Sequence, residues 1–145
     1  MNEAIKEAKI GIKNKEGGPF GAIIIDKENH IIATSHNTVL KDQDPTAHAE
    51  INAIREACKK LNTIDLSEYT LISTCEPCPM CLSAIIWSNI KRVYFGANRH
   101  DAEKVGFKDN AIYEYLKGQN QLLKIVDTKD KACIELLQEY DGKMY

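Results

Sequence analysis

The chain has 145 residues, which predicts a single domain over residues 1–145 with one hydrophobic core. Charged residues make up 28% and apolar residues 43%, and 19 basic against 21 acidic side chains give a formal charge of −2. There is no basic excess of the kind that phosphate-binding proteins carry, no apolar run of about 20 residues, and no even cysteine framework. We therefore expect a cytoplasmic protein with no membrane partner, and nucleic acid is a disfavoured partner.

The first half of the chain predicts two helices around a β-hairpin. Apolar side chains spaced three and four residues apart indicate the helices, and β-branched runs separated by four polar residues indicate the hairpin. The turn-forming residues 42–46 precede the second helix. The expected elements are a helix that ends before Gly17, strands at residues 20–26 and 31–35, and a helix from Ala47 to about Lys60.

The second half alternates strands and helices. Pro79 stands near the first turn of one expected helix, where its missing N–H costs little. The expected elements are strands at residues 69–73, 92–96 and 122–126, and helices at residues 79–88, 109–117 and 129–140. This order predicts an α/β fold, a three-layer α/β/α sandwich with a mixed sheet of about five strands.

Four residues in two short segments have the pattern of a catalytic metal site. Cys78 and Cys81 stand three apart at the start of an expected helix, so both sulfurs project from one face and the helix N-terminus favours thiolate. His48 and Glu50 stand two apart, and they can converge only around the open end of a helix. One histidine and two thiolates with an open position suit zinc, and we expect Glu50 to act as base on the bound water.

The motifs His48-Ala-Glu50 and Pro77-Cys78-Pro-Met-Cys81 resemble those of the cytidine deaminase-like superfamily of zinc-dependent nucleobase deaminases. The resemblance covers about residues 17–106. It implies the fold of that superfamily, a five-stranded α/β/α sandwich. It also implies one zinc ion per chain, held by His48, Cys78 and Cys81 with water as fourth ligand, and Glu50 as the proton shuttle.

Four further segments resemble the bacterial guanine deaminases: residues 17–21, 44–50, 75–81 and 101–109. The last of these carries most weight, because the tRNA-adenosine deaminases share the first three and differ there. The resemblance implies that Asn37 hydrogen-bonds the purine edge, that Phe20 and Trp87 are apolar walls, that Ala49 also contacts the base, and that Asp109 is a second catalytic proton carrier. It also implies a homodimer, for which domain swapping is one form. In that form a tail of about residues 141–145, ending in Tyr145, caps the partner's site.

The reaction that this resemblance implies is hydrolysis of guanine to xanthine and ammonia, with a small purine base and water as the reactants. Glu50 would pass a proton from zinc-bound water to N3 of the base, and the zinc-bound hydroxide would attack C2. Asp109 would then deliver the proton with which ammonia departs. The burial of an apolar-walled ring with a few polar contacts is how such pockets become specific.

The residues themselves leave other interpretations open. The enzyme could act on tRNA adenosine or on another amino-heterocycle such as cytosine or an aminotriazine. A structural zinc module is the non-enzymatic alternative, in which Cys75 joins the other two cysteines and His48 in a closed Cys₃His site. Phe20 and Trp87 could instead belong to a core, Asn37 could cap a turn, and Asp109 could be a helix N-cap.

Overall fold

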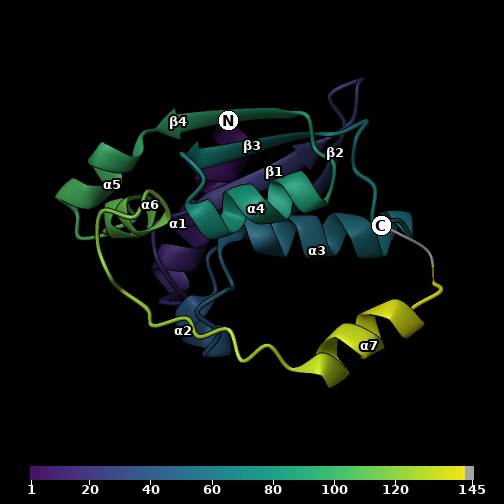
Figure 1. The fold of residues 1–145 in the computed structure, drawn as a ribbon. Coiled ribbons are helices and arrows are strands. Elements are labelled where there is room, and N and C mark those ends of the chain that lie inside the picture. The colour runs from purple at the N-terminus through teal and green to yellow at the C-terminus, as the bar shows by residue number, and fades with distance from the viewer. Residues whose placement is uncertain (143–145) are drawn as a thin grey trace.

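A four-stranded mixed sheet in the order β2-β1-β3-β4 forms the centre of the molecule in a computed structural model that describes residues 1–142 (Figure 1). The strand β1 is antiparallel to both of its neighbours, whereas β3 and β4 are parallel and are joined through a helix. The strands are β1 (Gly21–Ile25), β2 (Ile31–His36), β3 (Thr70–Cys75) and β4 (Arg92–Ala97).

Helices cover both faces of this sheet, as expected for a three-layer α/β/α sandwich. The helix α1 packs on one face, and α3 and α4 pack on the other (Figure 1). The helices are α1 (Asn2–Asn14), α2 (Val39–Asp42), α3 (Ala49–Leu61), α4 (Pro79–Trp87), α5 (Arg99–Lys104), α6 (Asn110–Leu116) and α7 (Lys131–Glu139). None of the helices in the described part of the chain has the length and apolarity needed to cross a membrane.

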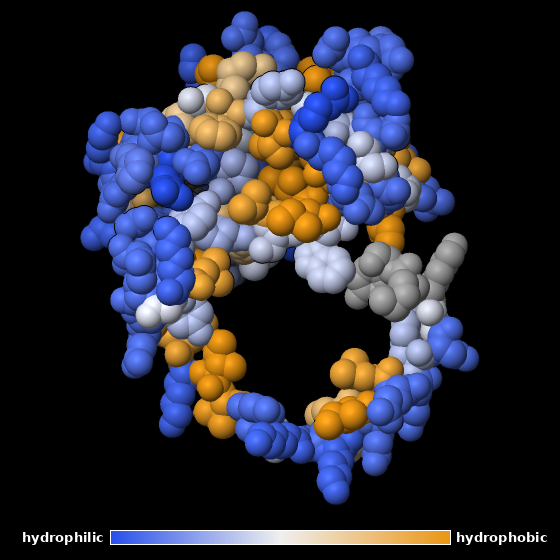
Figure 2. All heavy atoms as spheres, turned by 45° about the horizontal axis from the view of Figure 1, so that its top comes forward, coloured by the Kyte–Doolittle hydropathy of each residue, from blue (hydrophilic) through white to orange (hydrophobic). Residues whose placement is uncertain are grey.

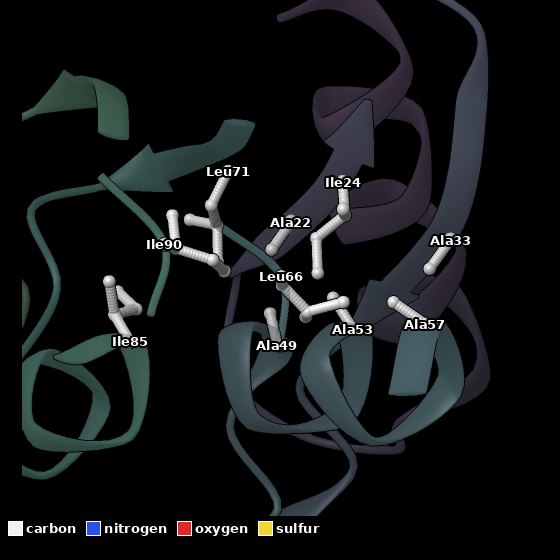
Figure 3. Packing of buried hydrophobic residues seen from close by; sticks show 10 residues of the cluster. All are labelled: Ala22, Ile24, Ala33, Ala49, Ala53, Ala57, Leu66, Leu71, Ile85 and Ile90. Atoms are coloured by element: carbon white, nitrogen blue, oxygen red, sulfur yellow. The ribbon is translucent and has the colours of Figure 1, made fainter. Parts of the chain in front are cut away.

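The side chains of β1 alternate between the two faces of the sheet, and this explains why helices pack on both faces. Gly21 faces α1, and a Cβ at this position would lie 2.0 Å from the carbonyl oxygen of Ala4, so only glycine permits the close approach. Ala22 and Ile24 face the opposite side, because successive side chains of a strand alternate. There they join the main core, in which alanines of α3 let the helix lie close to the sheet (Figure 3).

Larger side chains fill the rest of this core. Leu66 and Leu71 are fully buried, and Ile85 from α4 and Ile90 from the following turn pack beside them (Figure 3). Each such side chain contributes about 1.5–3 kcal/mol when it is removed from water. The core therefore fixes α3 and α4 against the same face of the sheet, and it is the first turns of these two helices that carry the metal-ligand motifs.

The observed elements agree with the predicted ones except in three places. The short helices α2 and α5 were not predicted. The strand predicted at residues 122–126 does not form, and residues 121–130 have no regular secondary structure. A strand requires a neighbour for its backbone hydrogen bonds, and within the described residues β4 pairs with β3 alone. The sheet described here therefore has four strands where about five were predicted.

Residues 119–142 form an arm that leaves the body of the molecule after α6 and ends in α7 (Figure 1). An open gap separates much of this arm from the body (Figure 2). The arm's apolar side chains are exposed: Leu122, Leu123, Ile125, Val126, Ile134, Leu136, Leu137 and Tyr140. A segment this apolar gains little by folding alone, because its side chains remain in water.

Candidate active site

Two helix N-termini meet where the metal-ligand motifs lie. His48 is the N-cap residue of α3 and Cys78 is the N-cap residue of α4, and both have extended backbones, with φ/ψ of −71°/156° and −65°/167°. His48 therefore lies outside the helix, while Glu50 lies in its first turn. This difference in backbone conformation is why two residues only two apart can direct their side chains to one place.

The three expected ligands have the spacing of a zinc site. His48 Nδ1 lies 3.6 Å from Cys78 Sγ and 3.5 Å from Cys81 Sγ, and the three donor atoms all lie within 4.8 Å of one another. A tetrahedral zinc ion with Zn–S of about 2.3 Å and Zn–N of about 2.0–2.1 Å places neighbouring sulfur and nitrogen ligands about 3.6 Å apart. The side chains present thus fit zinc in both chemistry and spacing.

Hydrogen bonds and burial set the charges of these ligands. A hydrogen bond from Cys81 lowers the pKa of Cys78, so this sulfur is the one that ionises first. The resulting hydrogen bond to Cys78 raises the pKa of His48. The hydrogen bond between Cys81 and Cys78 raises the pKa of Cys81, and burial raises it further. A bound dication favours the ionised thiolates that it needs as ligands.

Glu50 is a buried carboxylate directly beside the ligands. Only 5% of its surface is exposed, and burial raises its pKa. Ser73 in β3 donates a hydrogen bond of 3.1 Å to Oε1, and Oε2 lies 3.5 Å from Cys81 Sγ. One carboxylate oxygen is therefore held by the sheet, while the other lies next to a metal ligand. A buried carboxyl with a raised pKa beside a metal ligand is in the setting of a general acid–base group.

A cavity of about 630 Å³ opens onto His48, Glu50 and Cys78. One wall is formed by Phe20 and Phe107, whose rings meet edge to face with centroids 4.7 Å apart. A volume of this size and an apolar aromatic wall are typical of a small-molecule site. Phe20 thus lies in the wall of the cavity. Phe107, which was not assigned to the site from the sequence, adds a second aromatic ring to this wall.

Asn37 lines the same cavity and is almost completely buried. Its Oδ1 accepts hydrogen bonds from the backbone N–H groups of Gly18, at 3.1 Å, and Val39, at 3.2 Å. The side chain therefore organises the loop, as a turn-capping residue would, and still faces the cavity. Because Oδ1 is engaged twice, Nδ2 is the group left to donate toward a ligand. Gly17 must be glycine here, since a Cβ would lie 2.1 Å from this Oδ1.

Asp109 also lines the cavity, at the start of α6. Its side chain accepts no hydrogen bond from the helix N–H groups, so it does not act as the N-cap that its position allowed. Burial, and next the charge of Cys78, raise the pKa of Asp109. A partly buried carboxyl with a raised pKa therefore faces the cavity from the side of α6.

Three residues expected at the substrate lie elsewhere or outside the described region. Trp87 ends α4 and is 69% exposed, and it does not line the cavity of its own chain, because eight residues of helix place it about 12 Å from Pro79. Ala49 is fully buried at the start of α3 and faces the core, away from the cavity. Tyr145 lies outside the described residues.

Cys75 and Glu76 complete the wall near the ligands. Cys75 does not belong to the ligand group, since its Sγ lies 3.8 Å from the carbonyl oxygen of Asn98, and burial raises its pKa to about 11. A closed Cys₃His site is therefore not what the structure forms. Glu76 was not predicted as a site residue, although it lies in the motif between Cys75 and Cys78.

The sequence of this chain is similar to those of known deaminases. Residues 1–97 match the family model described as the cytidine and deoxycytidylate deaminase zinc-binding region. A guanine deaminase from Bacillus subtilis (strain 168) is 46% identical over 114 residues, which cover 79% of this chain and 72% of that protein. A tRNA-specific adenosine deaminase from Rickettsia bellii is 43% identical over 143 residues, covering 98% of this chain and 87% of that protein.

Solved structures give a similar result. The X-ray structure of guanine deaminase from Bacillus subtilis superposes with a TM-score of 0.86 and 36% identity, covering 99% of this chain and 94% of that one. A guanine deaminase from Nitrosomonas europaea superposes with a TM-score of 0.71 and 32% identity, covering 74% of this chain and 62% of that one. The first alignment takes in the C-terminal arm as well as the body.

Proposed function

The chain belongs to the cytidine and deoxycytidylate deaminase family and is a zinc-dependent nucleobase deaminase, and from this premise we propose that it hydrolyses free guanine to xanthine and ammonia. The single observation that carries the choice of guanine is the hydrogen bonding of Asn37. An asparagine that is free at both ends pairs with adenine through its oxygen and its nitrogen. Here Oδ1 is occupied by the N–H groups of Gly18 and Val39, so the side chain can only donate.

This donor suits the guanine edge better than the adenine edge. Guanine presents two acceptors, O6 and N7, side by side, whereas adenine presents one acceptor and an amino donor. An amino group that meets only donors is left unpaired, and burying it without a partner costs about 1–3 kcal/mol. The bacterial guanine deaminases among the similar proteins support the same choice.

The walls of the cavity favour a free base over a nucleic acid. Among the described residues that line the cavity there is neither lysine nor arginine, while Glu50, Glu76 and Asp109 are acidic. A polynucleotide backbone brings phosphates to the mouth of the site, and these require basic partners. The lining of the cavity therefore offers a phosphate group no basic partner, which the tRNA-adenosine alternative would need there.

In the proposed reaction, His48, Cys78 and Cys81 would hold a zinc ion, which would supply Lewis-acid activation of the attacking water. Glu50 accepts the proton of this water and returns it to N3 of guanine, which draws electron density from C2 as the new C–O bond forms. Asp109 donates a proton to the departing amino group, so that the C2–N bond breaks and ammonia leaves. The new C2 hydroxyl loses its proton as it becomes the carbonyl of xanthine, and this proton restores the Asp109 carboxyl. Phe20 and Phe107 exclude water from the face of the ring, while Asn37 fixes its orientation.

The same proposal includes a homodimer in which the arm of one chain completes the partner. The free edge of β4 carries exposed Tyr94 and Phe95, and α4 exposes Ile86. Figure 2 displays apolar patches on both the body and the inner side of the arm. Unpaired apolar edges are sites where another strand adds. A partner's residues 122–126 would supply a fifth strand, which the described residues 1–142 of this chain do not add to their own sheet.

All five cysteines are free thiols, which fits a reducing compartment such as the cytoplasm.

The deciding experiment is a substrate panel. Ammonia release is measured in parallel from guanine, adenine, cytosine, an aminotriazine and a tRNA anticodon stem-loop. We expect turnover of guanine at least tenfold above any other substrate by kcat/KM. Turnover of another substrate without turnover of guanine would overturn the assignment.

A further inference from the structure

The helix α6 carries Asp109 to the cavity, yet the hydrophobic core does not hold this helix. None of its residues is buried. A helix of seven residues is not stable in water by itself, so it requires tertiary contacts to keep its position. The position of the Asp109 carboxylate thus depends on the few side chains that attach α6 to the rest of the molecule.

Tyr113 makes such an attachment, and it does so at the loop that carries a zinc ligand. Its hydroxyl donates a hydrogen bond of 3.2 Å to the carbonyl oxygen of Pro77, the residue directly before Cys78. The guanidinium of Arg99 lies over the Tyr113 ring, 4.7 Å from its centroid. Such a cation–π contact contributes about 0.5–1 kcal/mol at an exposed site and more where water is excluded.

Arg99 is in turn bonded to the same loop. Its backbone N–H donates to Glu76 Oε2 at 3.0 Å, and its guanidinium lies 4.0 Å from Glu76 Oε1. The pair of Arg99 and Tyr113 therefore joins the start of α5 and the middle of α6 to residues 76 and 77 through both backbone and side-chain groups. This connection is polar and specific in its geometry, unlike apolar packing.

Asp109 and Tyr113 are four residues apart, and the backbone N–H of Tyr113 donates to the carbonyl oxygen of Asp109 at 3.4 Å. Residues at this spacing lie on one face of a helix. We propose that Tyr113 is a positioning residue that acts through Asp109: its hydrogen bond to Pro77 sets the distance between the proton-donating carboxyl and the zinc-ligand loop. This inference rests on the role of Asp109 in the proposed function.

The chemical consequence falls on the departure of ammonia. A proton donor must lie within hydrogen-bond reach of the leaving nitrogen, and a displacement of about 1 Å can cost a large factor in rate. Substrate binding depends on Asn37 and the aromatic wall, and Tyr113 is not among the residues that line the cavity. Loss of the Tyr113 hydroxyl should therefore lower kcat and leave KM nearly unchanged.

The test is a double-mutant cycle that combines Tyr113→Phe with Asp109→Asn, measured with whichever base of the substrate panel the wild type turns over. Tyr113→Phe keeps the ring under Arg99 and removes the hydroxyl, with its hydrogen bond to Pro77 and its side-chain hydrogen bond with Arg99. We expect kcat to fall about threefold to tenfold, KM to change less than twofold, and zinc content to stay at the wild-type level. In the Asp109→Asn background the same change should alter kcat less than twofold.

Tyr115→Phe on the same helix is the matched control, since the described structure gives its hydroxyl no hydrogen bond. It should have wild-type kinetics. Multiplicative effects of the two substitutions would overturn the inference, because Tyr113 would then act independently of Asp109. An unchanged kcat in Tyr113→Phe would overturn it as well. An active Asp109→Asn variant would instead remove the role that we propose for Asp109, and this outcome is distinguishable from the other two.

Discussion

The Ser73 hydroxyl and the Glu50 carboxylate form a buried hydrogen bond of 3.1 Å that links β3 to the first turn of α3. Ser73 pairs in register with Ala22 of β1 and Phe95 of β4, so its position is fixed by the sheet. The second carboxylate oxygen of Glu50 is thereby left beside Cys81. The sheet, through one serine, holds the proton carrier in place.

Replacement of Glu50 by glutamine should abolish turnover while the zinc content stays the same. The amide has nearly the same shape but cannot carry the proton, and general acid–base catalysis contributes about 10²–10⁴-fold. We expect kcat to fall by at least 100-fold at full zinc loading, measured by ammonia release and metal analysis. Glu56→Gln, an exposed residue of the same helix, is the control. A Glu50→Gln variant that retains a tenth of wild-type kcat would contradict the role of Glu50.

Cys75 should be dispensable for zinc. Its thiol lies outside the ligand group, and its Sγ lies 3.8 Å from the carbonyl oxygen of Asn98, so we expect no bond from Cys75 to the metal. Cys75→Ala should bind one zinc ion per chain and lose about 1 kcal/mol of stability as a small buried side chain is truncated. Cys81→Ala, the comparison variant, should lose the metal. Zinc stoichiometry after dialysis decides, and loss of zinc from Cys75→Ala would revive the structural Cys₃His interpretation.

The arm should hold the proposed dimer together. Ile125 lies in the apolar segment of the arm with 78% of its surface exposed. A charge placed there by Ile125→Asp would be buried without a partner in the dimer, so dissociation should increase at least tenfold. Lys124→Glu, whose side chain alternates to the other face of an extended segment, is the control. Light scattering at micromolar concentration measures the dissociation. A wild-type chain that is monomeric at this concentration would disprove the proposed dimer.

His36 should make stability depend on pH above neutrality. Its Nδ1 is bonded to Glu7 and its Nε2 to Glu16, so both ring nitrogens donate and the ring is an imidazolium. Burial alone would lower the pKa of His36, but the hydrogen bonds to Glu16 and Glu7 outweigh it and raise the pKa above 6.5. Lys41, which pairs with Glu16 at 3.3 Å, is the cation nearby.

The folded state binds the His36 proton more tightly than the unfolded state does, and this sets the sign of the pH dependence of stability. The contribution of His36 is complete below about pH 6.5 and is lost as pH rises through the raised pKa. Between pH 6 and pH 9 the melting temperature of the wild type should therefore decline more steeply than that of His36→Gln. His30→Gln, at an exposed turn, should follow the wild type. Parallel curves for wild type and His36→Gln would refute the prediction.

The sequence predicts the helices and strands of the body well because each has a clear period and packs on neighbours within the chain. The α5 helix was missed although Asn98 and Asp101 form a capping box, a signal that six helical residues without a period made easy to overlook. The strand at 122–126 was predicted from composition, yet pairing depends on which edge is available, and a sequence does not specify whether that edge is its own.

The residues of the site also differ in whether the sequence alone could identify them. His48, Glu50, Cys78 and Cys81 could be found from spacing because each pair lies within one turn of chain. Phe107 could not, because it meets Phe20 from 87 positions further along the sequence. Trp87 was assigned to the cavity by likeness, whereas the length of α4 carries it away from its own chain's site.

Because His48 and Cys78 are the residues at which two helices begin, the ligand geometry is tied to helix starts and not to the loops between them. An insertion at the exposed residues 64 and 65, between α3 and the buried Leu66, should leave the donor atoms in place. A single residue inserted between Cys75 and Cys78 would shift one helix start against the other. Tolerance to insertion should therefore change abruptly along a few positions of this chain.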